Sequence, residues 1–335
     1  MRSRRKRFLC FSPSRSNPSI ERMLSGLRPP SASHVKRQAS LRSQVVPSIL
    51  YKYTTHATAG AIIESGRLRW SSPNLFNDLA EFQRMPRFEP SLTEATSKLP
   101  TILVEAATGQ RTLDHDRLSP QTQLLIQLVQ MLLQAGITAS DIIESLQNDQ
   151  PDADQKMDEM LRAHMASLDL ARARVLCLTS DPENEVMWGT YADSHAGCAL
   201  GFTHIPELST PLQEARQVQY TEQAPVVGSG IDFLLYGDTS ELRARTHQAI
   251  CYTKKVPWSY EKEWRVVTWR WEERDSDVGH YKFYPKELVS VTFGARASAD
   301  GISQIRRLLG ANYPHVTLFR IVQKGEHLQR IKDDA

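Results

Sequence analysis

The chain has 335 residues, of which 40% are hydrophobic and 24% are charged, values typical of a protein with a sizeable core. Its net charge of +3 is uneven, because residues 1–50 carry eleven Lys or Arg and one acid, a net +10, which leaves a net −7 for residues 51–335. No apolar run approaches the length that crosses a bilayer, so the sequence predicts a soluble protein and confines any basic nucleic-acid-binding surface to the N-terminal segment.

Residues 1–46 are rich in Arg, Ser and Pro and lack periodic apolar residues, which predicts a disordered basic tail. The composition is similar to that of an organelle transit peptide. A nucleic-acid-binding arm, a secretion leader, an over-extended start with Met23 as the initiator, and a solvated tail without a specific function are the alternatives. The four cysteines form no C-x-x-C pair, which argues against structural zinc. We expect a cytoplasmic protein, or one that is secreted as an effector.

A compact strand, helix and strand open the predicted domain. Residues 49–53 form an apolar strand, and a helix from residue 56 buries Ile62 and Ile63. Gly66 is expected to end that helix in a left-handed conformation, and residues 68–71 form the next strand. The stretch SPNLFNDLAEF then reads as an ordered loop.

Residues 83–172 are predicted to be a helical insertion. Ser119 as an N-cap, Pro120 at the first helical position and Gly136 past the end delimit one of its helices. Met and Leu at helical spacing between residues 157 and 168 indicate a buried helix face rather than a cofactor site.

The second half is β-rich. Strands are predicted at residues 174–179, 197–203, 216–220, 263–270, 280–284, 288–293 and 315–322, with helices near 240–253 and 300–309. This order predicts an α+β fold with central mixed or antiparallel sheets over residues 47–325, followed by a polar C-terminal tail, residues 326–335. The chain contains no GxGxxG or Walker loop, which excludes Rossmann and P-loop readings.

The stretch MWGTYADSHAGCALGF places Trp188 and Tyr191 on one face of a helical turn. A Tyr hydroxyl that faces a cleft and a half-buried Tyr at a helix end capped by Asp193 and Ser194 have the same sequence pattern, so both readings stay open.

In WSYEKEWRVV, strand alternation places Glu261, Glu263 and Arg265 on one face. A ladder of exposed ion pairs is the simple interpretation, and such pairs need no function. The alternative is a reactive carboxylate in partly dry surroundings, because aromatic residues flank the pair. These aromatic residues are Trp258, Tyr260, Trp264, Trp269 and Trp271.

Three motifs in order, LYKYTT…IIESGRLRWSSPNLFND, VLCLTSDPENEVMWGTYADSHAGCALGF and WSYEKEWRVV, resemble DUF2971, a bacterial domain family of undefined function. The resemblance runs from about Leu50 to Val322. The chain departs from the family at Leu79, where proline often follows Asn-Asp, and in its long basic leader.

The opening unit also looks like the start of the ADP-ribosyltransferase fold, which uses a polar residue on its first strand, an aromatic residue and a glutamate on a late strand. The resemblance implies that NAD is the substrate and that no metal is needed. It implies Glu263 and Glu261 as catalytic residues. The implied NAD-binding residues are Lys52, Tyr53, Thr54, Asn77, Asp78, Trp188, Tyr191 and Arg265. The fold usually has His or Arg at the position of Lys52.

The leading hypothesis is therefore an NAD-dependent ADP-ribosyltransferase-like or NAD-cleaving enzyme, a toxin or anti-phage defence factor. It requires Lys52, Tyr191 and Glu263 to line one pocket. Its acceptor is a protein, a nucleic acid or water, and the basic tail offers contacts to nucleic acid or anionic surfaces. A non-catalytic ligand- or partner-binding module is the alternative. A metal-dependent nuclease that uses Asp78, Glu81 and Glu261 is a third, which no E-x-K motif supports.

Overall fold

The computed structural model describes residues 46–147, 150–167, 170–270, 272, 276–310 and 312–333. The predicted basic tail lies outside these residues except for Val46, and so does Trp271. The described chain divides into two compact units: the helical unit, residues 90–151 and 228–243, and the sheet unit, which holds the remaining described residues. The boundary at residues 243 and 244 lies within one helix, α9 (Ser240–Cys251).

The main helices of the helical unit are α3 (Leu92–Ala107), α4 (Pro120–Gln134), α5 (Ala139–Leu146) and α8 (Gly230–Tyr236). They enclose a core that includes Leu103, Val129 and Ile142. The predicted start of α4 is confirmed, because the Ser119 side chain accepts a hydrogen bond from the backbone of Thr122 and Pro120 opens the helix.

The predicted helical insertion, residues 83–172, does not coincide with this unit. Helix α6 (Ala153–Ser167), which falls within that range, belongs to the sheet unit, whereas α8 lies far outside the range in sequence and joins the helical unit. Helical periodicity marks where a helix forms but not which core receives its apolar face.

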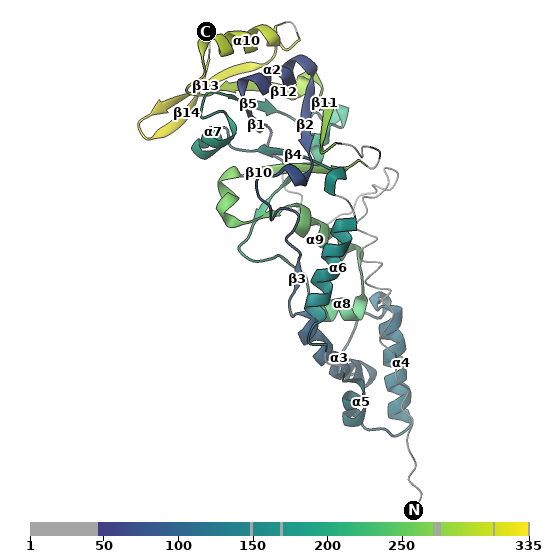
Figure 1. Cartoon of the computed structure of the whole chain (residues 1–335). Coiled ribbons are helices and arrows are strands. Elements are labelled where there is room, and N and C mark those ends of the chain that lie inside the picture. Colours follow the sequence, from purple (N-terminus) through teal and green to yellow (C-terminus); the bar gives the residue numbers. More distant parts are fainter. Residues whose placement is uncertain are drawn as a thin grey trace, which may run out of the picture. The chain divides into compact units, whose positions relative to one another are not determined.

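The sheet unit contains a ten-stranded mixed sheet (Figure 1). Its main order is β11-β2-β4-β1-β5-β12-β13-β14, and β10 pairs with both β4 and β6. The strands are β1 (Leu50–Thr54), β2 (Arg67–Ser71), β4 (Ala173–Thr179), β5 (Cys198–Phe202), β6 (Arg216–Gln217), β10 (Glu263–Trp269), β11 (Val278–Lys282), β12 (Leu288–Phe293), β13 (Thr317–Lys324) and β14 (His327–Lys332). Among the described strand pairs of this ten-stranded sheet, only β12 and β13 are parallel, and α10 (Ala299–Leu309) connects them.

Two small sheets complete the unit. One joins β3 (Arg87–Phe88) to β8 (Val226–Gly228), and the other joins β7 (Gln219–Tyr220) to β9 (Thr253–Lys254). The predicted strand at 216–220 is thus divided between two sheets at Val218, whose N–H donates to the carbonyl of Glu263. Residues 327–332 form β14 rather than the predicted polar tail.

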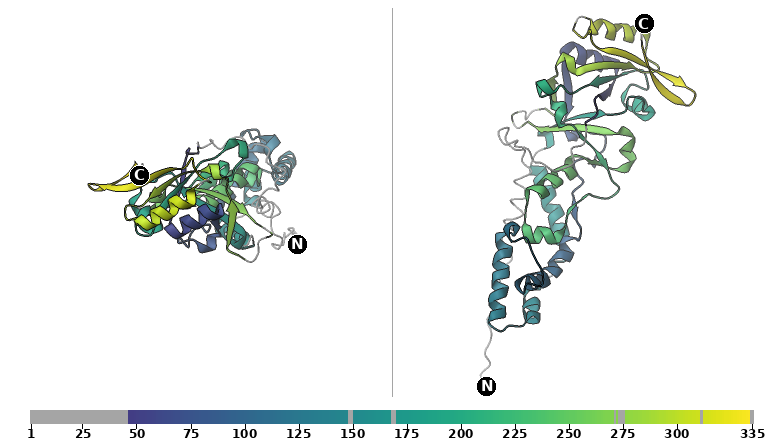
Figure 2. Two further views of the ribbon diagram at one scale, coloured as in Figure 1. Left: turned by 90° about the horizontal axis from the view of Figure 1, so that it is seen from above. Right: turned by 180° about the vertical axis from the view of Figure 1, so that it is seen from behind.

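Helices cover both faces of the main sheet (Figures 1 and 2). Helices α2 (His56–Ser65) and α10 supply Ile62, Ile63 and Ile305 to the larger core. As predicted, Gly66 ends α2 with a φ of 59°. Helix α7 (Glu185–Tyr191) packs on the opposite face, where Trp188 is fully buried against Tyr53. Within the described residues, no helix has the length and apolar character needed to cross a membrane.

Strand β4 has unequal edges, and this difference creates space. All seven of its residues pair with β10 along one edge. Along the other edge, β2 pairs only at Val175, opposite Ser71, and β1 pairs only at Thr179, opposite Tyr51. Cys177 lies midway between these two contacts. Because backbone groups along a strand point alternately to one edge and to the other, those of Cys177 point into the gap between β2 and β1, as those of Val175 and Thr179 point to this edge.

Candidate functional site

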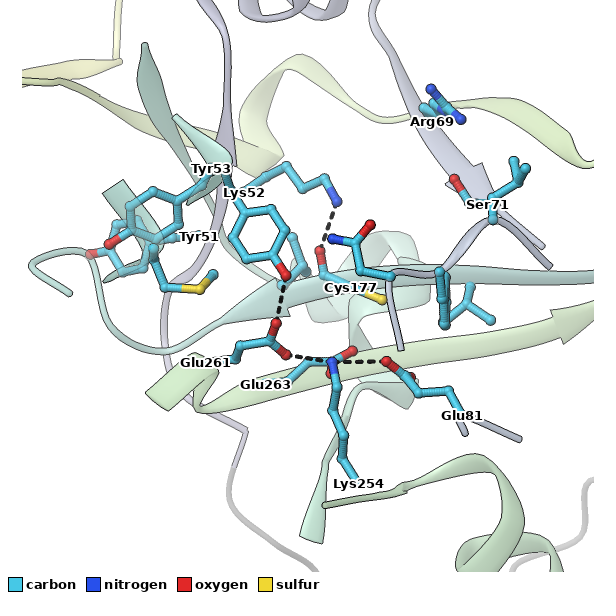
Figure 3. Close-up of a pocket in the computed structure, with 17 residues that line it drawn as sticks. Tyr51, Lys52, Tyr53, Arg69, Ser71, Glu81, Cys177, Lys254, Glu261 and Glu263 are labelled. Carbon is cyan, nitrogen blue, oxygen red and sulfur yellow. Dashed lines mark hydrogen bonds and ion pairs between the residues drawn. The ribbon is translucent and has the colours of Figure 1, made fainter. Parts of the chain in front are cut away.

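A pocket of about 280 Å³ lies at this gap, wholly within the sheet unit (Figure 3). Strand β1 contributes Lys52 to its lining, β2 contributes Arg69 and β4 contributes Cys177. Its aromatic residues are Tyr51, Tyr53, Phe76 and Tyr191, and its acids are Glu81, Glu261 and Glu263. The pocket therefore combines aromatic surface, three carboxylates and three basic side chains, the third of which is Lys254.

Lys52 takes the place of a strand partner for Cys177. Its Nζ donates to the Cys177 carbonyl oxygen at 3.1 Å (Figure 3). An ammonium group carries three donors, so two of them remain for a ligand or for water. In contrast to Lys52, Arg69 is exposed at the pocket rim.

On the opposite side of the pocket lies a buried ionic group, which we call the acidic cluster. It consists of Glu81, Lys254, Glu261 and Glu263, which line the pocket, and of Arg265 behind them. Exposed fractions are 6% for Glu81, 5% for Lys254 and Glu261, 4% for Glu263 and 1% for Arg265. Exposed ion pairs contribute at most about 1 kcal/mol, whereas breaking a buried pair costs about 3–5 kcal/mol. The interpretation of this motif as a surface charge ladder is therefore wrong.

Lys254 is the centre of the acidic cluster. Its Nζ lies 2.6 Å from Glu261 Oε2 and 2.8 Å from Glu81 Oε1. Glu263 Oε2 is farther from it, at 3.5 Å. The same ammonium lies 4.6 Å from the ring centroid of Trp258, so an aromatic face covers it.

Arg265 fixes Glu263 from behind the pocket. Its Nε and Nη2 donate to the two carboxylate oxygens of Glu263 at 2.9 and 2.7 Å, a bidentate arrangement. Its Nη2 also lies 2.8 Å from Glu81 Oε2, and its Nη1 donates to the Cys251 carbonyl at 3.0 Å. Arg265 therefore orients two pocket carboxylates and does not itself line the pocket.

Tyr191 ties α7 to the acidic cluster. Its hydroxyl donates to Glu261 Oε1 at 2.7 Å. Burial and the nearby Glu261 raise the pKa of Tyr191, so the phenol stays protonated and remains a donor. Glu261 thus accepts from Tyr191 with one oxygen and from Lys254 with the other.

The carboxyl groups of Glu81 and Glu263 have different proton affinities. Burial raises the pKa of Glu81, and the charge of Glu263 adds to that effect against the opposing Arg265 and Lys254. Burial also acts on Glu263, but Arg265 and Lys254 outweigh it and lower the pKa of Glu263 to about 2. The difference follows the geometry, because Glu263 receives both arms of Arg265 and Glu81 receives one.

Glu261 does not lie on the strand that the sequence predicts. It is the last residue of a 3₁₀ helix, Val256–Glu261, and Lys262 follows with a φ of 43°. Strand β10 begins only at Glu263. The left-handed Lys262 redirects the chain, so Glu261 reaches the pocket through a turn, and Lys262 itself pairs with Asp181 at the surface.

Six of the ten predicted site residues line the pocket: Lys52, Tyr53, Asn77, Tyr191, Glu261 and Glu263. The requirement that Lys52, Tyr191 and Glu263 line one pocket is therefore met. Four predicted residues are not among the lining residues. Thr54 is buried in β1, Trp188 donates through Nε1 to the Pro182 carbonyl, and Asp78 accepts from the Ala80 N–H. Arg265 is the fourth.

Sequence reasoning missed Lys254 and the role of Glu81. Lys254 is one of two adjacent lysines in CYTKKV, and nothing local distinguishes it from its exposed neighbour Lys255. Only the structure distinguishes it, by placing it in the short strand β9, which is buried at both residues, where a lysine needs a carboxylate partner. Glu81 had been considered only as a metal ligand.

The described residues contain no group of three or more His, Cys, Asp or Glu side chains that could hold a metal ion. The ammonium of Lys254 lies between Glu81 and Glu261, where a cation shared by these two carboxylates would bind. The geometry therefore gives the metal-dependent nuclease hypothesis no support.

Comparison with known proteins gives one match. No curated protein and no solved structure matches the chain. Thus the likeness to the ADP-ribosyltransferase fold stays a prediction, whereas a fold of mixed α and β structure with a mixed sheet is confirmed. Residues 187–266 match the model of a domain family described as "Protein of unknown function (DUF2971)", which supports the predicted domain family. The matched segment contains Tyr191, Lys254, Glu261 and Glu263 of the pocket.

Proposed function

We propose that the pocket binds the nicotinamide riboside half of NAD and cleaves its N-glycosidic bond, with water or an unidentified acceptor as nucleophile. The observation that carries the proposal is the Tyr191–Glu261 hydrogen bond of 2.7 Å on the wall of a pocket that Glu263 and Lys52 also line. It supplies an oriented carboxylate beside aromatic surface, as cleavage of a cationic N-glycoside requires.

The reaction breaks the bond between ribose C1′ and the nicotinamide nitrogen, and its electron pair neutralises the pyridinium ring. A C1′–O bond then forms to water or the acceptor, which loses a proton to solvent. Positive charge grows on the ribose before that bond is complete, and a nearby carboxylate stabilises it. Nicotinamide leaves as a neutral molecule, so the reaction needs no general acid for its leaving group.

Glu261 is the better candidate than Glu263 for this contact. Both oxygens of Glu263 are held by Arg265, and Glu263 also accounts for much of the charge that balances that buried guanidinium. Glu261 has one neutral partner, Tyr191, and one cationic partner, Lys254. Because each carboxylate oxygen accepts up to two hydrogen bonds, Glu261 keeps capacity for ribose hydroxyls.

The test is release of nicotinamide from NAD by the purified full chain. Glu261→Gln is expected to lower the rate by about 100-fold or more, the usual effect of removing one electrostatic contact to a transition state. Glu64→Gln, on the exposed face of α2, is the matched control and should retain the rate. Equal rates for the two variants, or no release by the unchanged protein with any acceptor, would refute the proposal.

A non-catalytic ligand-binding pocket is the second candidate. It is favoured because Glu81 and Glu263 are already paired with cations of the protein. All four of their carboxylate oxygens accept from Lys254 or Arg265. In that case NAD or a related nucleotide would raise the melting temperature without being consumed.

A further inference from the structure

The acidic cluster carries an imbalance of charge. With every member ionised, Glu81, Glu261 and Glu263 supply three negative charges, and Lys254 and Arg265 supply two positive ones. The remaining negative charge is buried, and an unbalanced buried charge is strongly unfavourable. Either a proton or a cation from outside the cluster must compensate it.

Another cation of the pocket, Lys52, is held by a neutral group. Lys52 donates to the carbonyl of Cys177, and in the described part of the chain no ion pair joins it to a carboxylate. Lys52 is also only partly buried, so water screens its charge. It therefore leaves the charge of the cluster largely uncompensated.

Glu81 is the member most suited to hold a proton. The charged or titratable groups that act on it or that it acts on are Arg265 and Glu263 from β10, Lys254 from β9 and Cys177 from β4. Glu261 from the 3₁₀ helix and Lys52 from β1 line the same pocket. Glu263 is committed to the bidentate pair with Arg265, which favours its ionised form. Burial, the largest effect on Glu81, acts in the opposite direction and raises its pKa.

The pocket wall offers a second feature that recognises cations. Tyr53, Phe76 and Tyr191 line it together with the three carboxylates, and aromatic faces attract positive charge. A flat cationic ring would meet aromatic surface on its faces and carboxylates at its edge. The neutral form of the same ring would gain only the apolar contact.

From this arrangement we infer that the pocket selects a ligand with a positively charged group and that binding of this group releases one proton from Glu81. The inference deepens the proposed function, on whose site it rests, by naming the charge of the ligand. It holds equally for a pocket that binds such a ligand without turning it over.

The experiment compares two probes of nearly the same shape, 1-methylnicotinamide, which is a cation, and nicotinamide, which is neutral. Neither has a glycosidic bond, so neither is consumed by the proposed reaction. Dissociation constants for the full chain are measured by ligand-observed NMR from pH 5.5 to 8.5. At the high end of this range, the cation is expected to bind at least about tenfold more tightly than nicotinamide.

The sign of the pH dependence follows from the raised pKa of Glu81. Below that pKa the carboxyl is protonated, so the cation must displace the proton, and affinity should rise by up to about tenfold per pH unit as pH increases. Above the pKa the affinity should level off. Nicotinamide binding should not show this rise.

Glu81→Gln should remove the rise and weaken binding of the cation, whereas Glu64→Gln should reproduce the unchanged protein. Circular dichroism establishes that each variant is folded. If Glu81→Gln does not fold, proton release is counted directly on the unchanged protein with pH indicators in weak buffer at several pH values. Release of up to one proton per bound 1-methylnicotinamide is expected, and the released fraction should grow as pH is lowered.

Three results would overturn the inference: equal affinity for the two probes, affinity for the cation that does not change with pH, or no binding of the cation at any pH. The proposed function fails separately, through lack of nicotinamide release from NAD. Proton-linked binding of the cation without turnover would leave this inference intact.

Discussion

At the scale of single residues, the pocket depends on Arg265 more than on any residue that a ligand would touch. This side chain is 1% exposed and holds Glu263 and Glu81 in fixed orientations. The ionised Glu263 compensates the charge of this buried side chain through the bidentate pair, because an isolated guanidinium in the interior is very unfavourable. The contacts of Arg265 with Glu263 and Glu81 therefore both orient the pocket carboxylates and stabilise β10.

Replacing Arg265 should accordingly be costly. Arg265→Gln is expected to lower the free energy of unfolding by about 3–5 kcal/mol, because Glu263 loses its bidentate partner in a buried site. Urea denaturation provides the measurement. Lys262→Gln is the matched control. Lys262 lies three residues before Arg265 in sequence and forms an exposed pair with Asp181, so its loss should cost at most about 1 kcal/mol. Similar losses for both variants would contradict the role given to Arg265.

At the scale of elements, the turn after α7 is the most unusual backbone in the site. Asp193, Ser194 and His195 have φ values of 50°, 51° and 72°, three consecutive left-handed residues without a glycine. Each such residue is disfavoured by roughly 1 kcal/mol. Backbone hydrogen bonds from His195 to Trp188 and from Gly197 to Ala192 hold the turn closed, and the turn sets where α7 ends and presents Tyr191.

Ser194 tests whether the turn is strained. Ser194→Gly should leave stability unchanged or raise it by up to about 1 kcal/mol, since glycine adopts positive φ freely but also gains freedom in the unfolded chain. Ser194→Val should lower stability by about 1–2 kcal/mol, because β-branched residues avoid this conformation. Thermal unfolding of the two variants at this exposed position checks both. A more stable Val variant would show that the turn is not under strain.

Elements with local signals were predictable, and long-range partners were not. Strand β1, helix α2 with its Gly66 cap and strand β2 follow from apolar spacing and one glycine. The convergence of Tyr191, Glu263 and Lys52 was foreseen as a requirement, through a resemblance rather than through periodicity. The pairing of Lys254 with Glu81 was not, because the two residues are 173 positions apart and neither has a distinctive neighbourhood. Glu261 was assigned to the wrong element because alternation cannot anticipate a left-handed Lys262.

At the scale of the whole molecule, the pocket and the helical unit have separate cores. Every residue that lines the pocket belongs to the sheet unit, and Ile142 and Val129 lie in the core of the helical unit. We therefore expect the geometry of the pocket to be preserved when the packing of these helices is weakened.

Ile142→Ala should show this separation. Ile142 is fully buried, so the substitution should lower the stability of the helical unit by about 2–5 kcal/mol. Amide hydrogen exchange is expected to accelerate in α3, α4 and α5 and to stay unchanged in β4 and β10. Leu176→Ala, in the core under β4, should give the reverse pattern. Faster exchange throughout the chain in either variant would mean that the two units unfold together.

The seven-residue pairing of β4 with β10 determines which side chains of β10 point toward the pocket. Glu263 lies opposite Thr179, Arg265 lies opposite Cys177, and Trp264 falls between them on the other face, in the larger core. Inserting one residue just before Glu263 would shift the sequence of β10 by one position relative to β4. Trp264 would then point toward the pocket, and Glu263 would point into the hydrophobic core. Insertions and deletions in β10 should therefore disrupt the pocket far more than substitutions do. Homologous chains with an intact pocket should keep the two-residue spacing between the positions of Glu263 and Arg265 even where other residues of the strand differ.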